Sequence, residues 1–492
     1  MVAKLVIPRN NHEIIFKQIA EQISQKVTET LNQCQNLLRE GKIFEITEIV
    51  KNLESEILDL IWETIIKFIL ADKYFLKLLR FLGAMKALKF VSYQQITIIL
   101  PTGTRIKIRS PFFVKAKAKH GRKKRGPQNR GAHLALELLG FVDKVAPELA
   151  FHAIQLAVLA PSFQIASEML KRANVELSAN KISKLCQKLG NLSLPERVEL
   201  ILDDGESFEG KRVLIGIDGG RLRSRKTKKG AIPKGKKQHR FHTNWIEPKL
   251  FTVHVLNEDG NIIKEISPFV DGTTGKLPQL IKLFSQYLST LQIDKASEVI
   301  IVGDGAPWIW ERIPALLENL GVAKEKISQV IDWTHAKQNL LQAFTMLPQK
   351  ILKNTKFNFQ TFKNLLFEGE IDKIVLKIKE LFKAFKNSKI FKKFKTYFLP
   401  NRERMQYKNF ELRKLPIGSG VIESAIRRVV NLRLKSPGSF WKLDCAEIMI
   451  FLRAQLLYGR WQTIKKNWMT KLHDQFHDIL TSCLLPLHLK KI

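Results

Sequence analysis

The sequence predicts a multidomain protein of the α+β class, in which a mixed α/β domain is combined with helical regions. Three observations favour this class. Residues 57–70 repeat apolar side chains at intervals of three and four, the period of a helix with a broad buried face. Residues 213–340 alternate short β-like runs with helical segments. Residues 341–412 are rich in lysine, phenylalanine, leucine, isoleucine and asparagine at helical spacing.

The chain is expected to divide into successive segments of distinct secondary structure. The segments are a helical N-terminal region (1–95), a β-hairpin turning at Pro101–Thr104 with a basic loop (96–131), a helical DNA-binding region (132–205), the first part of an α/β core (210–340), an all-helical insertion (341–412), the last part of the core (413–460) and a helical tail (461–492).

The order of elements in the α/β core identifies its topology. The expected strands are 213–218, 249–256, 262–266, 298–302 and 329–332, and the expected helices are 276–291, 306–320 and one that begins near His335. The resulting order, β-β-β-α-β-α-β-α, is that of a ribonuclease-H-like fold. In such a fold a mixed sheet carries an acidic site at its strand ends.

The composition indicates a polyanionic partner. The chain has 82 lysine and arginine residues against 46 aspartate and glutamate residues, a formal charge of +36. RNA, the ribosome, an anionic membrane and DNA all satisfy this charge. Two basic clusters, 115–130 and 221–240, contain glycine and proline and are predicted to be loops. The second cluster follows shortly after Asp218, an aspartate at the end of the β-like run 213–218 and a candidate catalytic residue. This position favours contact of the cluster with phosphate.

The sequence also argues against several protein classes. No run of 18 apolar residues is free of charged residues, and the N-terminus lacks an apolar signal core, so we expect a cytoplasmic protein. The four cysteines are far apart and form no C-x-x-C pair, which argues against a zinc site and favours reduced thiols.

Three acidic residues are candidates for the site. Asp218 and Asp304 each end an apolar β-like run and are each followed by glycine, and Glu423 lies in a glycine-bounded segment, 416–425. Acidic side chains at neighbouring strand ends of a basic chain suggest carboxylates that hold a divalent metal against a nucleic-acid phosphate. Alternatively, the two aspartates are turn formers before glycine, and Glu423 pairs with Arg427 one helical turn later.

A candidate helix-turn-helix spans residues 162–189. Ser162 and Ser178 are predicted to cap its two helices, and the connection between the helices is short. The second helix would carry polar side chains on exposed positions, namely Asn180, Lys181, Lys184, Gln187 and Lys188. Such a helix could enter a major groove, although an ordinary helical hairpin explains the same pattern.

At the level of motifs, residues 210–455 resemble bacterial insertion-sequence transposases of the DDE type, ribonuclease-H-like enzymes with a helical insertion before the last acid. The resemblance is carried by Gly216–Gly220, Gly303–Trp310, Asp332–Ala336, Pro416–Ala425 and Arg433–Trp441. The pair Asp332-x-x-His335 looks like the D/C-x-x-H element of several such groups. Many relatives carry paired cysteines ahead of the catalytic domain, and this chain has none.

The resemblance implies that Asp218, Asp304 and Glu423 are the catalytic and metal-binding acids, 86 and 119 residues apart along the chain. They would bind two Mg²⁺ ions, for which Mn²⁺ can substitute, and cut or join DNA by in-line displacement. Asp332 and His335 would be auxiliary residues, His335 being equally well explained as a structural histidine.

The resemblance also implies that the partner is DNA, as the terminal inverted repeats of a mobile element and as target DNA. A homodimer or a higher homo-oligomer is expected because two ends must be brought together, and the protein would associate with the nucleoid. The candidate DNA-binding residues are Lys181, Lys184, Lys188, Arg221, Arg223, Arg225, Lys226, Lys228, Lys229, Arg427, Arg428, Arg433 and Lys435. The tryptophans Trp308, Trp310 and Trp441 are more readily core residues than base-stacking ones.

Other functions remain open at this point. The segment Ile215–Gly220 could be the phosphate loop of an actin-like sugar kinase, but such a kinase needs a later adenosine loop and no large positive charge. A domesticated, non-catalytic DNA-binding protein would not need all three acids. A ribonuclease-H-like nuclease or junction resolvase would share the chemistry, and only a joining assay separates it from a transposase.

Overall fold

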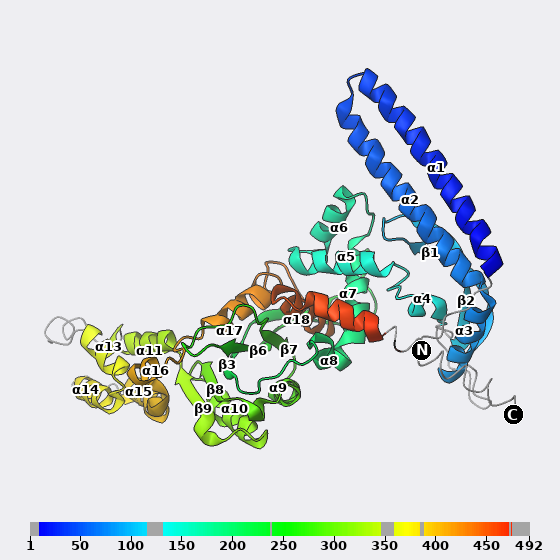
Figure 1. Ribbon diagram of the computed structural model, residues 1–492. Helices are drawn as coiled ribbons and strands as arrows, with labels where there is room; N and C mark the ends of the chain where they lie inside the picture. The colour runs from blue at the N-terminus through cyan, green and yellow to red at the C-terminus, as the bar shows by residue number, and fades with distance from the viewer. Residues whose placement is uncertain are drawn as a thin grey trace. The chain divides into compact units, whose positions relative to one another are not determined.

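The computed structural model describes residues 9–115, 131–236, 239–345, 359–383, 388–471 and 474. The predicted basic loop at 116–130 and most of the predicted C-terminal tail lie outside the described residues. The chain forms two compact units, one built from residues 1–189 together with 465–492 and the other from residues 190–464 (Figure 1).

The first unit begins with three helices and a hairpin. The helices are α1 (Arg9–Arg39), α2 (Ile43–Ala71) and α3 (Lys73–Met85), and the strands are β1 (Leu88–Ile99) and β2 (Arg105–Lys115). Buried residues of α2, α3 and both strands form one core. The prediction of helix up to residue 95 was therefore wrong from Leu88 onward. The helix cannot continue because Ala87 adopts a left-handed conformation, with φ of 52°.

The rest of the first unit is helical, with α4 (Leu134–Leu138), α5 (Pro147–Leu159), α6 (Phe163–Arg172) and α7 (Ala179–Ser193). Both predicted caps are present. The hydroxyl of Ser162 accepts a hydrogen bond from Ile165 N at 3.1 Å, and that of Ser178 accepts one from Lys181 N at 3.2 Å. Residues 465–471 return to this unit, where Lys465 pairs with Glu148 and Trp468 contacts Phe151.

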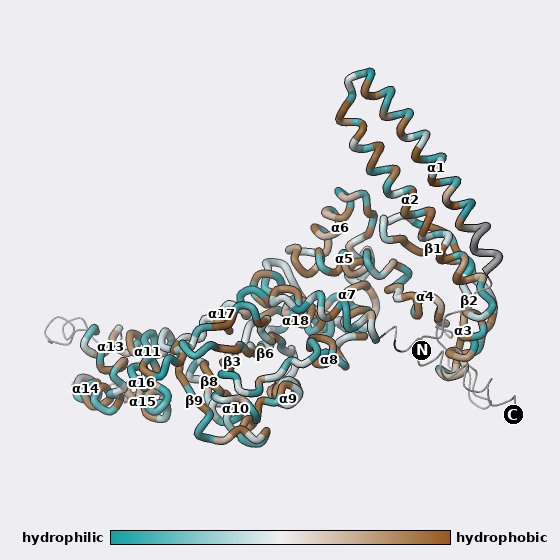
Figure 2. Tube along the Cα trace, viewed as in Figure 1, coloured by the Kyte–Doolittle hydropathy of each residue, from teal (hydrophilic) through white to brown (hydrophobic). Residues whose placement is uncertain are grey.

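A five-stranded mixed sheet forms the centre of the second unit. Its strand order is β7-β6-β3-β8-β9, and its strands are β3 (Arg212–Gly219), β6 (Lys249–Leu256), β7 (Phe269–Thr273), β8 (Glu298–Gly303) and β9 (Ile327–Ile331). Strands β6 and β7 run antiparallel to their neighbours, whereas β3, β8 and β9 are parallel. Figure 2 shows the apolar runs of β3 and β8, whose residues between Val213 and Ile217 and between Val299 and Gly303 are buried.

The third strand of the sheet lies further along the chain than predicted. Residues 262–266 were expected to pair as a strand, but only Ile262 forms a bridge, with Leu256, and the chain then turns. The pairing partner of β6 is β7 instead. All five residues of β7 are buried, and helix α18 (Leu443–Leu457) packs against them, so burial from both sides selects this segment.

The basic segment 221–240 is only partly the loop that was predicted. Its first part forms β4 (Leu222–Thr227), which pairs antiparallel with β5 (Phe241–Ile246) in a hairpin separate from the main sheet. The alternation of Leu222, Ser224 and the intervening arginines explains the strand, because Leu222 and Ser224 are buried while Arg225 is exposed.

Helices cover the sheet and fill the chain between β9 and the last acidic segment. Beside α18 they are α8 (Arg197–Ile201), α9 (Leu277–Thr290), α10 (Pro307–Asn319), α11 (Trp333–Thr345), α13 (Phe359–Phe367), α14 (Ile371–Lys383), α15 (Ser388–Phe398), α16 (Tyr407–Leu412) and α17 (Gly420–Ala425), the last continuing into a π-helical turn at Ile426–Asn431. Residues 461–471 are also helical. Among the helices described, none is both long and apolar enough to cross a membrane.

Candidate active site

The register of the sheet places three aspartates at one level. Gly216 of β3 pairs with Val302 of β8, so Asp218 and Asp304, each two residues further on, lie side by side at the strand ends. Gly303 pairs with Ile331 of β9, so Asp332 lies next to Asp304 in the same way. Three adjacent parallel strands therefore each present an aspartate at their carboxyl ends.

The turns after the strands hold the first two carboxylates in place. The carboxylate of Asp218 accepts a hydrogen bond from Gly219 N at 2.6 Å, and that of Asp304 accepts one from Ala306 N at 2.9 Å. The indole of Trp310 donates to the carbonyl oxygen of Asp304 at 2.9 Å. Trp310 is itself buried, so its observed role is to fix the end of β8 rather than to offer a ring to a base.

Glu423 reaches the same region from helix α17, which packs against β3 and β6. This close packing depends on the glycine at position 216. A Cβ atom there would lie 3.0 Å from Ile422 Cβ and 2.9 Å from Thr252 Oγ1, so a larger residue would push the helix away. The hydroxyl of Ser419 donates to Glu423 Oε1 at 2.9 Å, while 51% of the Glu423 side chain remains exposed.

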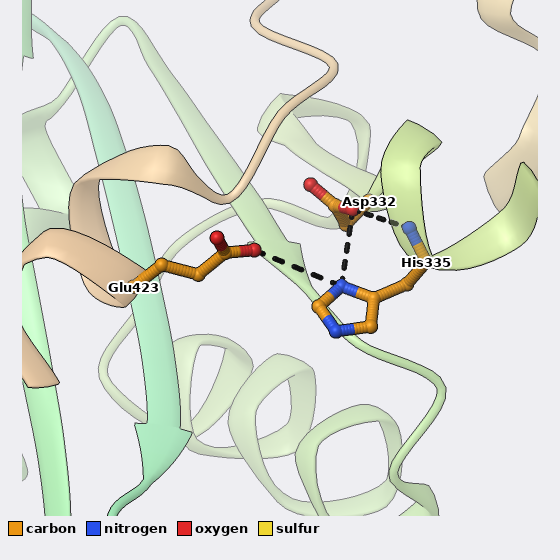
Figure 3. Close-up of side chains that lie close together, drawn as sticks. All are labelled: Asp332, His335 and Glu423. Atoms are coloured by element: carbon orange, nitrogen blue, oxygen red, sulfur yellow. Dashed lines mark hydrogen bonds and ion pairs between the residues drawn. The ribbon is translucent and has the colours of Figure 1, made fainter. Parts of the chain in front are cut away.

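Asp332 joins the sheet to the segment that carries Glu423, and Figure 3 shows its contacts with His335. Its Oδ2 accepts a hydrogen bond from Ser419 N at 2.6 Å. Its Oδ1 accepts from the backbone N of His335 at 2.6 Å and from His335 Nδ1 at 3.0 Å. Nearby, Trp333 N donates to Ile417 O at 2.9 Å. Both oxygens of Asp332 are thus engaged, so the residue positions its neighbours better than it could bind a metal.

This role of Asp332 has a local signal in the sequence. An aspartate that follows an apolar strand and precedes a helix is a favoured N-cap, and its carboxylate accepts the N–H three residues later. That residue is His335, as observed. The contact with Ser419, 87 residues away along the chain, has no local signal and required the structure.

His335 lies between two of the acids. Its Nδ1 is 3.0 Å from Asp332 Oδ1 and 3.9 Å from Glu423 Oε1, and one ligand atom from each of the three residues falls within a 4.8 Å cluster. The hydrogen bond to Asp332 raises the pKa of His335, with further support from the charges of Asp304 and Glu423. A histidine whose Nδ1 faces a carboxylate keeps Nε2 available for a ligand or a phosphate.

The pKa values of Asp218 and Asp332 are shifted in opposite directions. Burial, reinforced by the neighbouring Asp304 and Glu423, raises the pKa of Asp218 to about 6, although Gly219 N–H and His335 oppose this. Burial alone would raise the pKa of Asp332 as well, but the hydrogen bonds from His335 and Ser419 outweigh it and hold that pKa at about 2. Asp218 is therefore the acid for which a nearby cation would relieve the most unfavourable charge.

The donor set fits a divalent metal. Asp218, Asp304 and Glu423 supply carboxylate oxygens, which are the ligands that Mg²⁺ and Mn²⁺ prefer. Burial is the main cause of the raised pKa of Asp218, and the charges of Asp304 and Glu423 add to it, so a bound cation would favour the ionised carboxylate. The tight group within 4.8 Å, however, contains Asp332, His335 and Glu423, whereas the proximity of Asp218 and Asp304 follows from the strand register.

The predicted DNA-binding residues of the candidate helix-turn-helix are partly engaged in other contacts. Lys181 Nζ is 2.8 Å from Asp143 Oδ2, and Lys188 Nζ is 2.7 Å from Asp143 Oδ1. Lys184 is exposed on the same helix. The two ion pairs are consistent with a packed helical hairpin, and a phosphate would have to compete with Asp143 for both lysines.

The other predicted basic residues fall into two groups. The exposed residues are Arg221, Arg225, Lys226, Lys228, Lys229, Arg427 and Lys435, and the half-buried ones are Arg223 and Arg428. Arg433 differs from both groups, since it is buried with its guanidinium 5.1 Å from the centre of the Trp441 ring. The expectation that Arg433 lies on a phosphate-facing surface is therefore wrong for this conformation. Trp441 is buried too, consistent with a core role.

Comparison with known proteins identifies no relative by sequence. No known protein family and no curated protein matches the chain. One solved structure is described as the Drosophila P element transposase strand transfer complex. Its alignment covers 65% of this chain and 80% of the chain in that structure, with 12% sequence identity and a TM-score of 0.24. A TM-score this low does not establish a shared fold.

Proposed function

We propose that the protein is a DNA transposase of the DDE type, which cuts and joins DNA strands with the help of divalent metal ions. The single observation that carries the proposal is the placement of Asp218 and Asp304 at the ends of adjacent parallel strands, with Glu423 brought to the same region by α17. Acidic residues gathered in this way in a chain of charge +36 suit chemistry on a polyanionic substrate.

The sheet supports a ribonuclease-H-like catalytic core. Three antiparallel strands, β3, β6 and β7, are followed by two strands that extend the sheet parallel to β3 on its other side. This arrangement agrees with the element order from which that fold was expected. The helices between β9 and α17 would then be an insertion ahead of the last acid, as in the transposases that the motifs resemble.

The proposed metal site consists of Asp218, Asp304 and Glu423. When bound there, two Mg²⁺ ions would activate water or a 3′-hydroxyl and stabilise the leaving oxygen of the phosphodiester. The protein's own contribution is positional. Asp218 and Asp304 are fixed by the turns after their strands, and Glu423 is oriented by Ser419.

Asp332 and His335 are proposed to organise the site from its edge. Asp332 ties the segment before α17 to the end of β9, so it sets the distance between Glu423 and the aspartates of the sheet. His335 Nδ1–H is oriented by Asp332, and its pKa is raised by that contact, which favours the protonated form. A protonated imidazole at this place would attract the phosphate of a DNA strand.

The test is cleavage and joining of labelled DNA by the full-length protein with Mg²⁺ or Mn²⁺. Plasmid DNA and, once located, the ends of the element serve as substrates. We expect Asp218→Asn, Asp304→Asn and Glu423→Gln to bind DNA as the native protein does but to lose at least about 100-fold in rate, since each would remove a metal ligand. Asp294→Asn, an exposed acid on the same unit, is the matched control and should retain full activity.

Each outcome of this experiment bears on a different part of the proposal. Full activity in any one of the three variants would exclude that residue as a metal ligand. Cleavage without joining by the native protein would favour a nuclease or resolvase of the same fold. Binding without cleavage under any divalent ion would favour a non-catalytic DNA-binding protein.

A further inference from the structure

The β4–β5 hairpin has two unlike faces. Side chains alternate along a strand, so one face carries Leu222 and Ser224, both buried, while the other carries Arg223, Arg225 and Thr227. The register pairs Arg223 with Trp245 and Thr227 with Phe241, so residues of β5 share this second face. We call it the arginine–aromatic face, and it consists of Arg221, Arg223, Arg225, Phe241, Trp245 and the adjoining Phe440.

The arginines of this face lie against its rings. The guanidinium of Arg221 is 4.7 Å from the centre of the Trp245 ring. That of Arg223 lies 4.8 Å from Phe440 and 5.8 Å from Trp245, and that of Arg225 lies 5.8 Å from Phe241. These contacts pack the three guanidinium groups against the rings, and Arg223 also donates a hydrogen bond to Ser436 O at 3.2 Å.

Phe440 is brought to the hairpin by the segment that follows the last acid. Trp441 N donates to Arg223 O at 3.0 Å, and Arg225 N donates to Trp441 O at 2.8 Å, so this segment pairs along the free edge of β4. The ring of Phe440 then contacts Phe241, with ring centres 5.6 Å apart. The arginine–aromatic face is thus attached to the part of the chain that also carries Glu423.

The charge on this face is not neutralised by the protein. Among the described residues, no carboxylate forms an ion pair with Arg221, Arg223 or Arg225. The rings are accessible as well, since 49% of Trp245 and 39% of Phe241 are exposed. Uncompensated arginines beside exposed aromatic rings match the chemistry of a nucleic-acid strand, which offers a phosphate and a base at every step.

A pocket adjoins the face beside the end of β3. It has a volume of about 520 Å³, and its lining includes Gly219, the residue after Asp218, together with Arg221, Trp245 and Lys435. The acidic residue in its lining, Glu247, lies 3.5 Å from Lys249 Nζ. A strand bound on the hairpin could therefore continue through a basic pocket to Asp218.

We propose that the arginine–aromatic face binds an unpaired DNA strand and leads it to Asp218. The bases stack on Trp245 and Phe241, and the phosphates contact Arg221 and Arg225. Bases within a duplex are covered by their neighbours, so rings that receive them require a strand that is already separated. This inference rests on the proposed function for the identity of the nucleic acid.

The experiment measures binding of full-length protein to a labelled thymidine oligonucleotide and to a duplex of equal length by fluorescence anisotropy. Chelator is present throughout, so binding is measured apart from any cleavage. We expect Trp245→Ala to weaken single-strand binding about tenfold, given the usual worth of a stacked base, and to change duplex binding less than about twofold. Arg221→Lys, which keeps the charge but loses the planar guanidinium that lies 4.7 Å from the centre of the Trp245 ring, should also weaken single-strand binding.

Tyr74→Ala is the matched control, because Tyr74 is an exposed ring with a lysine, Lys77, placed 5.8 Å from its centre, and it belongs to the other unit. It should leave single-strand binding unchanged. Equal losses for single strand and duplex in Trp245→Ala, or a loss as large in Tyr74→Ala, would overturn the proposal. Asp218→Asn should retain the binding, so failure of catalysis and failure of this face can be told apart.

Discussion

At the scale of single residues, Asp218 combines a position at the end of β3 with an unfavourable charge. Its pKa is raised to about 6 by burial and by the acids beside it, whereas an aspartate in an unfolded chain has a pKa of about 3.9. The protonated carboxyl therefore stabilises the fold at low pH. That contribution is complete below about pH 4 and is lost as the pH rises through about 6.

Replacing Asp218 by Asn should make the fold less sensitive to pH. In chelator, we expect the melting temperature of Asp218→Asn to match that of the native protein below about pH 4 and to exceed it at about pH 7.5. The rise in the pKa of Asp218 corresponds to a stability difference of at most about 3 kcal/mol between low and high pH, and the partial exposure of the side chain makes the difference smaller. Thermal unfolding at both pH values measures it. A native protein that matches the variant at both pH values would contradict the raised pKa.

Asp332 should matter for stability as well as for activity. Asp332→Ala leaves Ser419 N and His335 N without the acceptor that they have in the native fold, and we expect it to lower the free energy of unfolding by about 1–3 kcal/mol. Ser419→Ala removes the hydroxyl that contacts Glu423 and Asp332 but keeps the backbone N–H that Asp332 accepts, so its stability should fall less than that of Asp332→Ala while its activity falls. Urea unfolding of both variants checks this, and equal stability of Asp332→Ala and native protein would exclude the positioning role.

At the scale of elements, the distance between α17 and the sheet depends on one missing side chain. Gly216→Ala would introduce a Cβ atom 3.0 Å from Ile422 Cβ and 2.9 Å from Thr252 Oγ1. We expect the displaced helix to carry Glu423 away from the aspartates, with a loss of at least about tenfold in cleavage rate, because small errors in position are costly in catalysis.

The control for this substitution is a glycine of α17 itself. A Cβ atom at Gly420 meets no other atom within 4 Å, so Gly420→Ala should keep both stability and activity. Cleavage rates and melting temperatures of the two variants, measured side by side, provide the comparison. Full activity in Gly216→Ala would mean that α17 tolerates the shift and that its close packing does not set the site.

The elements also show how far sequence reasoning could reach. Strand ends that carry Asp218 and Asp304 could be predicted because an apolar run, an acid and a glycine are adjacent in the chain. The third strand could not be placed correctly, since β7 contains Asp271, Gly272 and Thr273 and has no apolar pattern of its own, and its burial against α18 is a tertiary contact. Likewise, the burial of Arg433 under Trp441 is a tertiary contact without a local pattern.

At the scale of the whole molecule, a charge of +36 should dominate binding to DNA. Each phosphate neutralised by lysine or arginine releases counterions, so affinity falls with salt. If about six or more phosphates are contacted, duplex affinity should fall roughly 1,000-fold or more between about 50 and 200 mM salt. Anisotropy titrations over this range measure the slope. Nearly constant affinity would mean that the charge serves another partner.

The central claim is that Asp218 and Asp304 bind divalent metal. It is tested most directly by titrating full-length native protein with Mn²⁺ at pH 7.5, following the free ion by electron paramagnetic resonance, with Mg²⁺ as competitor. We expect Mn²⁺ binding that Mg²⁺ displaces, that Asp218→Asn and Asp304→Asn both weaken strongly, and that Asp294→Asn leaves unchanged. Native-like Mn²⁺ binding in both aspartate variants would contradict it.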